Sequence, residues 1–154
     1  MNIHATCIRI GNAGRLFGAP AGAGVLLLGK SGAGKSDLAL RLIARGAQLV
    51  TDDRTELKVV GGKLIASAPK SIAGLLEVRG VGIVRMAHAQ RVAVSLAVEL
   101  ASDPPRLPDD LAYRPPPPLK LDASACPTLI ALDPFEASAP EKVLVAVARQ
   151  RLLR

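Results

Sequence analysis

The chain of 154 residues is poor in aromatic side chains, since it has no tryptophan, one tyrosine and two phenylalanines. Proteins that bind single-stranded nucleic acid stack bases on aromatic rings, so this scarcity counts against that class. Hydrophobic residues still make up 49% of the chain and charged residues 21%, which excludes a disordered protein. We therefore expect one compact domain over residues 1–154 with an aliphatic core.

The sequence also lacks long apolar runs, a secretion signal and a cysteine framework. No run reaches the ~18 residues that span a bilayer, and no basic stretch followed by an apolar one opens the chain. Cys7 and Cys126 have neither disulfide nor metal-site spacing, and we interpret both as small buried thiols. These absences favour a cytoplasmic protein with no membrane partner.

Positive charges outnumber negative ones. Twenty lysines and arginines against thirteen aspartates and glutamates give a formal net charge of +7. Such a balance suits an anionic partner, for example a nucleotide, a phosphate or an acidic protein. The basic residues are scattered along the chain rather than clustered, so we expect no nucleic-acid partner.

Hydrophobic patterning predicts an α/β fold. Residues 36–45 have the period of an amphipathic helix, and Ser138–Glu141 reads as a capping box that opens a last helix running to the C-terminus. A glycine-rich turn is expected at 11–14. The predicted strands cover residues 4–10, 25–28, 48–51, 55–60, 63–66, 76–78, 82–86, 92–100 and 128–132. Residues 103–118 hold seven of the twelve prolines and are predicted to form an extended loop.

The most specific motif is a phosphate-binding loop. Residues 29–36 read GKSGAGKS and match GxxxxGK[ST], between a predicted strand and a predicted helix. Glycines let backbone amides turn inward around phosphate oxygens, and the helix N-terminus adds its positive dipole end. Lys35 supplies a cation, and the Ser36 hydroxyl can bind Mg²⁺. We expect a nucleoside triphosphate to be held by Gly29, Ser31, Gly32, Ala33, Gly34, Lys35 and Ser36.

Two adjacent acids, Asp52 and Asp53, follow the strand after that helix. Phosphoryl transfer needs a metal ligand and a group that takes the nucleophile's proton, and these two carboxylates can divide that work. The alternative is a solvated turn. A further acid, Asp133, also follows an apolar strand, but Pro134 comes directly after it and we interpret Asp133 as a turn residue.

Residues 77–84 form a third unusual stretch, EVRGVGIV, which alternates charged and apolar residues before two glycines. On its own it indicates only an edge strand, with glycines where the backbone approaches a ligand.

Together, GKSGAGKSD, ARGAQLVTDD and EVRGVGIV make the chain similar to bacterial HPr kinase/phosphorylase, which carries GxSGxGKSE, RGHxLVADD and EIRGLGI in this order. The resemblance covers about residues 4–86. It implies a P-loop kinase core of the HPr kinase and phosphoenolpyruvate carboxykinase type, a mixed sheet with few helices. It further implies ATP-dependent phosphorylation of a serine of HPr, the carrier of the sugar phosphotransferase system, or of a related phosphocarrier. Phosphate removal by inorganic phosphate, which releases pyrophosphate, and hexameric assembly are also implied.

The same resemblance implies roles for individual residues. Lys35 and the amides of 32–36 would hold the β-phosphate, while Ser36, Asp53 and Glu77 would surround Mg²⁺. Asp52 would be the base in the kinase direction and the acid in the reverse. Arg79 would support the transferred group or the acid beside it. His4 would contact phosphate or the base, with a structural histidine as the alternative.

Three features depart from the family pattern. Its members usually carry an additional N-terminal domain, so the resemblance is to a catalytic domain alone. The family's basic PGRN-like loop reads PFEASAP at 134–140, without arginine or lysine, and a further C-terminal helical segment has no counterpart. These departures leave two alternatives open, an ATP-binding sensor without catalysis and a small-molecule kinase.

Overall fold

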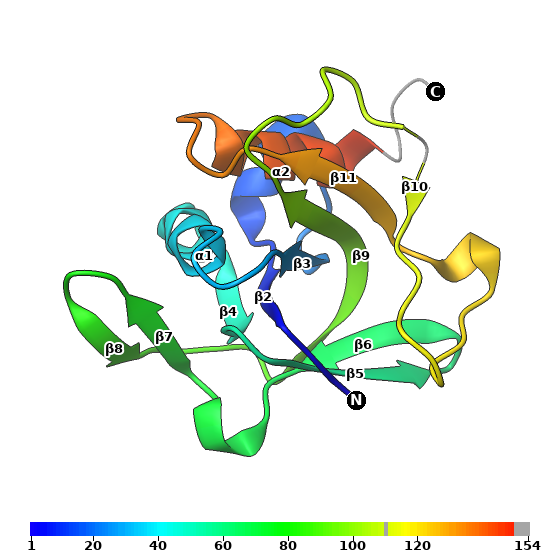
Figure 1. Ribbon diagram of the computed structural model, residues 1–154, viewed down its shortest axis with the longest axis horizontal. Coiled ribbons are helices and arrows are strands. Elements are labelled where there is room, and N and C mark those ends of the chain that lie inside the picture. Colours follow the sequence, from blue (N-terminus) through cyan, green and yellow to red (C-terminus); the bar gives the residue numbers. More distant parts are fainter. Residues whose placement is uncertain (110, 150–154) are drawn as a thin grey trace.

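The computed structural model describes residues 1–109 and 111–149. A curled mixed sheet has two α-helices on one face (Figure 1). The helices are α1 (Lys35–Ala44) and α2 (Ala139–Ala148), and short 3₁₀ helices cover Asn12–Phe17, Lys70–Ile72 and Ala123–Ala125. The strands are β1 (Asn2–Ile3), β2 (Ala5–Arg9), β3 (Gly24–Leu28), β4 (Gln48–Thr51), β5 (Thr55–Val60), β6 (Lys63–Ser67), β7 (Leu75–Val78), β8 (Gly82–Arg85), β9 (Arg91–Leu100), β10 (Leu111–Ala112) and β11 (Thr128–Leu132).

The sheet is organised around β9, its longest strand. The first residues of β9 pair antiparallel with β6, and the following residues run parallel to β3 on one side and β11 on the other. Beyond β3 the order continues through β2 to β4, and β2 is antiparallel to both neighbours. As a result β3, β4, β9 and β11 all run in one direction, and their carboxyl ends lie at the same edge.

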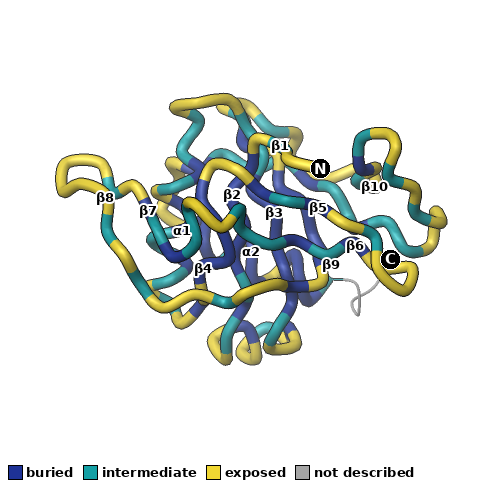
Figure 2. The backbone as a smooth tube through the Cα atoms, turned by 90° about the horizontal axis from the view of Figure 1, so that it is seen from below, coloured by how far each residue is buried: buried dark blue, intermediate teal, exposed yellow. Residues whose placement is uncertain are grey.

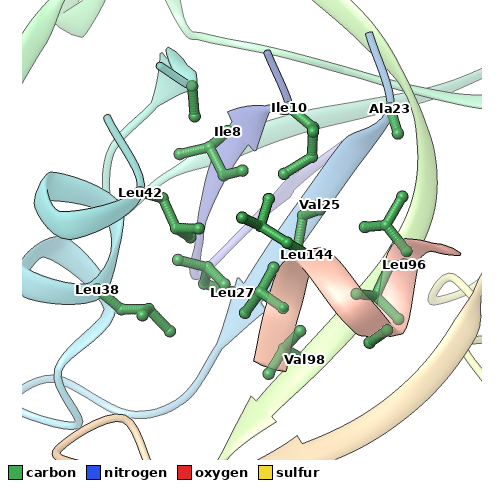
Figure 3. Close-up of a cluster of buried hydrophobic side chains, with 14 of the residues drawn as sticks. Ile8, Ile10, Ala23, Val25, Leu27, Leu38, Leu42, Leu96, Val98 and Leu144 are labelled. Carbon is green, nitrogen blue, oxygen red and sulfur yellow. The ribbon is translucent and has the colours of Figure 1, made fainter. Parts of the chain in front are cut away.

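Alternation along the central strands divides the core between the two faces of the sheet. Val25 and Leu27 face the helices, whereas Leu26 between them faces the opposite side. Figure 3 shows the helix side, where Leu38 and Leu42 of α1 and Leu144 of α2 pack against β2, β3 and β9. The period of 3.6 residues in α1 places Leu38 and Leu42 on one face, which explains why this segment is helical.

The other face of the sheet is covered by a β-hairpin and a loop rather than by helices. The β5–β6 hairpin packs there through Leu57, Leu64 and Ala66, and Tyr113 and Leu119 of the proline-rich segment rest against the same cluster. Figure 2 shows the buried central strands in dark blue and the tip of the β7–β8 hairpin exposed in yellow. That hairpin forms a separate two-stranded sheet.

The predicted fold class, a mixed sheet with few helices, is confirmed, and the predicted strands lie within one or two residues of those observed. The predicted glycine-rich turn is wrong in extent, because a 3₁₀ helix covers Asn12–Phe17. In its described parts, 103–109 and 111–118, the proline-rich segment is an extended loop except for β10, which pairs with β11. Because proline lacks a backbone N–H, such a segment cannot enter the interior of a sheet, but it can supply a two-residue edge strand.

The predicted capping box is also wrong. Ser138 precedes α2 with φ −86° and ψ 5°, not in the extended conformation of a capping residue, and its side chain makes no cap hydrogen bond. Glu141, the other residue of the predicted box, pairs with Arg45, which directly follows α1. Helix α2 is described to Ala148, and the prediction that it runs to the C-terminus falls at 150–154 on residues outside the described part. Cys7 is buried as predicted, whereas Cys126 is only partly buried. Within residues 1–109 and 111–149, no helix has the length and apolarity needed to cross a membrane.

Candidate active site

The three sequence motifs meet at the carboxyl edge of the sheet for a topological reason. Since β2 lies between β3 and β4 and is antiparallel to both, its first residues lie beside the last residues of its neighbours. Ala5 is paired with Leu28, and Cys7 with Thr51. The phosphate loop after β3, the acids after β4 and the residues around His4 therefore emerge side by side, where open α/β sheets usually bind ligands.

The phosphate loop turns directly into α1. Gly34 adopts φ +103°, a left-handed conformation that an L side chain rarely takes, and the helix begins at Lys35. Lys35 Nζ donates to the backbone carbonyls of Gly29 at 2.6 Å and Lys30 at 3.0 Å. The pKa of Lys35 is lowered from its ordinary value, because burial outweighs the opposing effect of the Asp53 and Asp52 charges.

Asp52 connects the phosphate loop to the rest of the site. Its Oδ1 accepts hydrogen bonds from Ser36 Oγ at 2.7 Å and Thr6 Oγ1 at 2.9 Å, and its Oδ2 accepts one from the backbone N–H of Glu77 at 3.1 Å. The residue is 8% exposed. A buried carboxylate needs partners of this kind, and Asp52 thereby joins α1, β2 and β7.

Asp53 has the opposite environment. Its side chain is 62% exposed, and Oδ1 lies 2.6 Å from Nε2 of His4. Its backbone N–H donates to Thr6 Oγ1 at 3.0 Å. Asp53 has φ +68° and is the one described non-glycine residue with a positive φ. Such conformations concentrate at functional sites, where surrounding contacts hold them in place.

Glu77 and Arg79 reach the site from the β7–β8 hairpin. The buried Leu76 anchors β7, which packs against α1, while Glu77 and Arg79 are exposed. The hydrogen bond from the Glu77 backbone to Asp52 fixes the hairpin beside the acids.

These elements border an open cleft of about 480 Å³. Its floor is formed by the phosphate loop and the first turns of α1, namely Ser31, Gly32, Gly34, Lys35, Ser36, Asp37 and Leu40. Its walls are Asp53, Glu77, Val78, Arg79 and Phe135. Most of the predicted site residues thus share one cleft. Four predicted site residues in the described part of the chain do not line the cleft, namely Gly29, Ala33, Asp52 and His4. Asp52 and His4 nevertheless form hydrogen bonds with residues that line it.

Two residues of the site, Thr6 and Phe135, were not predicted from the sequence. Thr6 joins Asp52 and Asp53, and its only signal was a polar residue in an otherwise apolar strand. Phe135 lies in the loop after β11, and its exposure could not be read from the sequence. The interpretation of Asp133 as a turn residue is confirmed, since its Oδ1 accepts from the backbone N–H of Phe135 at 2.9 Å.

The chain is similar to known proteins in sequence and in fold. The family model described as HPr Serine kinase C-terminal domain matches residues 13–101, more than half of the chain. The HPr kinase/phosphorylase of Clostridium beijerinckii is 54% identical over 63 residues, which are 41% of this chain and 21% of that protein. The HPr kinase/phosphorylase of Brevibacillus brevis is 54% identical over 66 residues, with 42% and 21% covered. The matches to these relatives thus span about a fifth of their length.

A solved structure is similar over nearly the whole chain. The HPr(Ser) kinase/phosphatase of Coxiella burnetii superposes with a TM-score of 0.73 at 26% identity, over 99% of this chain and 97% of that one. The similarity therefore includes β11 and α2, which lie beyond the residues matched by the family model.

Proposed function

Because the chain belongs to the family of the HPr serine kinase C-terminal domain, we propose that it transfers phosphate from ATP to a serine of HPr or a related phosphocarrier protein. The observation that carries this proposal is the contact set of Asp52, which joins Ser36 of the phosphate loop to Thr6 and to the backbone of Glu77. In the reaction the seryl oxygen bonds to the γ-phosphorus, the bond to the β-phosphate oxygen breaks, and ADP leaves.

In this proposal the phosphate loop holds the nucleotide. The backbone amides of 32–36 face the β-phosphate, and the Lys35 ammonium contributes a charge-assisted hydrogen bond. An ammonium group has three N–H donors. Two of them already bind the carbonyls of Gly29 and Lys30, which leaves the third for a phosphate oxygen. The loop therefore orients Lys35 before the nucleotide arrives.

Mg²⁺ fits the oxygen donors around Ser36. Mg²⁺ is usually held by one or two carboxylates together with substrate phosphates, rather than by a protein cage. The described residues include no group of three or more His, Cys, Asp or Glu side chains arranged around a metal, so the ligands proposed here include a hydroxyl group. We propose that Ser36, Asp52 and Glu77 hold the ion, which when bound neutralises charge on the phosphate oxygens.

This assignment exchanges the roles that the resemblance implied for the two acids. Asp52 is buried, does not line the cleft, and already accepts three hydrogen bonds on its two carboxylate oxygens. Asp53 lines the cleft, is exposed and lies beside His4. We propose that Asp53 takes the seryl proton, that His4 orients it, and that Arg79 stabilises the charge of the transferred phosphoryl group.

The reverse reaction would use the same residues. Inorganic phosphate would attack the phosphoserine, pyrophosphate would leave the site, and Asp53 would return the proton to the seryl oxygen. We further propose that the protein works in the cytoplasm, where ATP and phosphocarrier proteins occur, and that it assembles as a homo-oligomer, a hexamer by family resemblance.

The proposal is tested with labelled ATP, Mg²⁺ and purified HPr. Wild type should give serine-linked label, and Asp53→Asn should bind ATP normally at neutral pH but transfer phosphate at least ~100-fold more slowly. Asp52→Asn should weaken the Mg²⁺-dependent part of ATP binding. Asp122→Asn, in a loop away from the cleft, is the matched carboxylate control and should behave as wild type.

Other results would redirect the assignment. Normal ATP binding by Asp52→Asn with lost transfer, together with active Asp53→Asn, would restore the roles implied by the resemblance. ATP binding that depends on Lys35 without label on HPr or any other acceptor would indicate a nucleotide sensor. Label that moves only to a small molecule would indicate a small-molecule kinase.

A further inference from the structure

The loop after β11 places an exposed aromatic ring directly on the phosphate loop. Phe135 is 70% exposed, although large apolar side chains are normally buried. A Cβ built on Gly34 would lie 3.3 Å from Phe135 Cζ, 3.4 Å from Cε1 and 3.2 Å from Pro134 Cγ. The ring therefore borders the phosphate loop and lines the cleft, and most of its surface is exposed.

The backbone that carries this ring is held from several sides. Arg41 of α1 donates from Nη2 to the carbonyl of Pro134 and from Nη1 to that of Glu136 at 3.4 Å. The side chain of Asp133 accepts from the Phe135 N–H, and Glu136 pairs with Lys142 of α2. Contacts of this number fix the backbone of an otherwise exposed loop, so the ring is presented in a defined place.

Phe135 and the acidic residue Glu77 line the cleft from two segments that lie on opposite sides of α1. In Figure 1 the loop after β11 lies on one side of α1 and the β7–β8 hairpin, which carries Glu77 and Arg79, lies on the other. A triphosphate whose terminal phosphate lies near Asp53 and Glu77 has its nucleoside at the opposite end. That end is bordered by Phe135.

We propose that Phe135 is the platform on which the nucleobase of the bound nucleotide stacks, and that Arg41 is a positioning residue for it. This inference rests on the proposed binding of ATP. Within residues 1–109 and 111–149, Phe135 is the aromatic residue that lines this cleft, while Tyr113 packs against the opposite face of the sheet. Stacking uses the face of a base and not its edge, so purine nucleotides should bind with similar affinities.

The test separates the base from the phosphates by comparing ATP with inorganic tripolyphosphate. Phe135→Ala should weaken ATP binding about tenfold, the typical cost of losing one stacked base, and leave tripolyphosphate binding within about twofold. Arg41→Ala should weaken ATP binding in the same selective way. Arg45→Ala is the matched control, because Arg45 lies four residues later, at the end of α1, and pairs with Glu141, and it should change neither affinity.

A tryptophan variant gives a direct optical readout. The chain has no tryptophan, so Phe135→Trp introduces a single fluorophore at the proposed platform. ATP and GTP should quench its emission, whereas tripolyphosphate should leave it unchanged.

The inference is overturned if Phe135→Ala leaves ATP affinity unchanged, or if it weakens ATP and tripolyphosphate equally. Equal quenching by ATP and tripolyphosphate would also overturn it, since that result would indicate loop movement without stacking. A failure of the proposed ATP binding gives a different result from a failure of the stacking inference. If the phosphate loop does not bind ATP, tripolyphosphate binding will not depend on Lys35. Thermal melts verify that Phe135→Ala and Phe135→Trp are folded. We expect both to fold, because Phe135 is exposed and contributes little to the core.

Discussion

Thr6 Oγ1 donates a 2.9 Å hydrogen bond to Asp52 Oδ1, and the same oxygen accepts one from the backbone N–H of Asp53 at 3.0 Å. One buried hydroxyl on β2 therefore positions both acids that follow β4. The two carboxylates are adjacent in the chain but differ in environment, since Asp52 is buried and Asp53 is exposed.

Removing this hydroxyl should reduce activity more than stability. Thr6→Val keeps the shape of the side chain and leaves the Asp53 N–H without its partner, at a cost of about 1–3 kcal/mol. Thr55→Val is the control, because Thr55 is equally buried but its hydroxyl donates to the Ala5 carbonyl at 2.9 Å instead. Urea unfolding should show similar losses for both variants, while phosphorylation of HPr falls only in Thr6→Val. Equal activity losses would contradict a specific role for Thr6.

The lowered pKa of Lys35 predicts an alkaline limit for nucleotide binding. Only the protonated amine binds a phosphate oxygen, so affinity is constant below its pKa and falls as the pH rises above it. Because burial lowers this pKa, the decline should begin at a lower pH than for an ordinary lysine. Asp53→Asn removes a charge that raises the pKa and should move the decline lower still. The measurement is the ATP dissociation constant between about pH 7 and pH 10.

Lys35→Arg provides the control for this assignment. A guanidinium stays protonated throughout the range, so the alkaline decline should disappear whatever the affinity at neutral pH. A decline that persists unchanged in Lys35→Arg would show that another group causes it.

A close backbone contact predicts a glycine requirement far from the cleft. A Cβ on Gly11 would lie 2.2 Å from the backbone oxygen of Gly46, where the chain leaves α1. Gly11→Ala must push these two segments apart, which we expect to cost about 2 kcal/mol, or roughly 4–8 °C in Tm. Ala13→Ser, at an exposed neighbouring position, is the control and should melt as wild type. An unchanged Tm for Gly11→Ala would contradict this contact.

The two cysteines should differ in reactivity. Cys7 is fully buried, and burial raises its pKa far above the usual range, whereas Cys126 is partly exposed. A thiol reagent at about pH 8 should modify one thiol in the native protein and two after unfolding. Cys126→Ser should abolish the native reaction. Rapid modification of two native thiols would be inconsistent with the position of Cys7 on β2.

Much of the site was predictable from residues that are close in the chain. The phosphate loop, the helix that follows it and the strand before it form one local unit whose glycines, lysine and serine have fixed spacing. The strand that precedes Asp52 belongs to the same continuous segment. Local conformational preferences and hydrophobic period determine such elements, and these were found within one or two residues.

Contacts between distant segments were decided only by the tertiary structure. The antiparallel insertion of β2 between β3 and β4 brings Thr6 and His4 to the acids, and it gives Asp52 and Asp53 their different burial. The same holds for Glu141, which the sequence pattern placed in a capping box and the structure pairs with Arg45. Phe135 lies about a hundred residues after the phosphate loop in the chain but beside it in space. The reason is that β9 runs parallel to β3 on one side and to β11 on the other, so the loops after β3 and β11 emerge at the same edge. Spacing along the chain determines local turns and helices, whereas side-chain burial and pairing depend on which segments the sheet places next to one another.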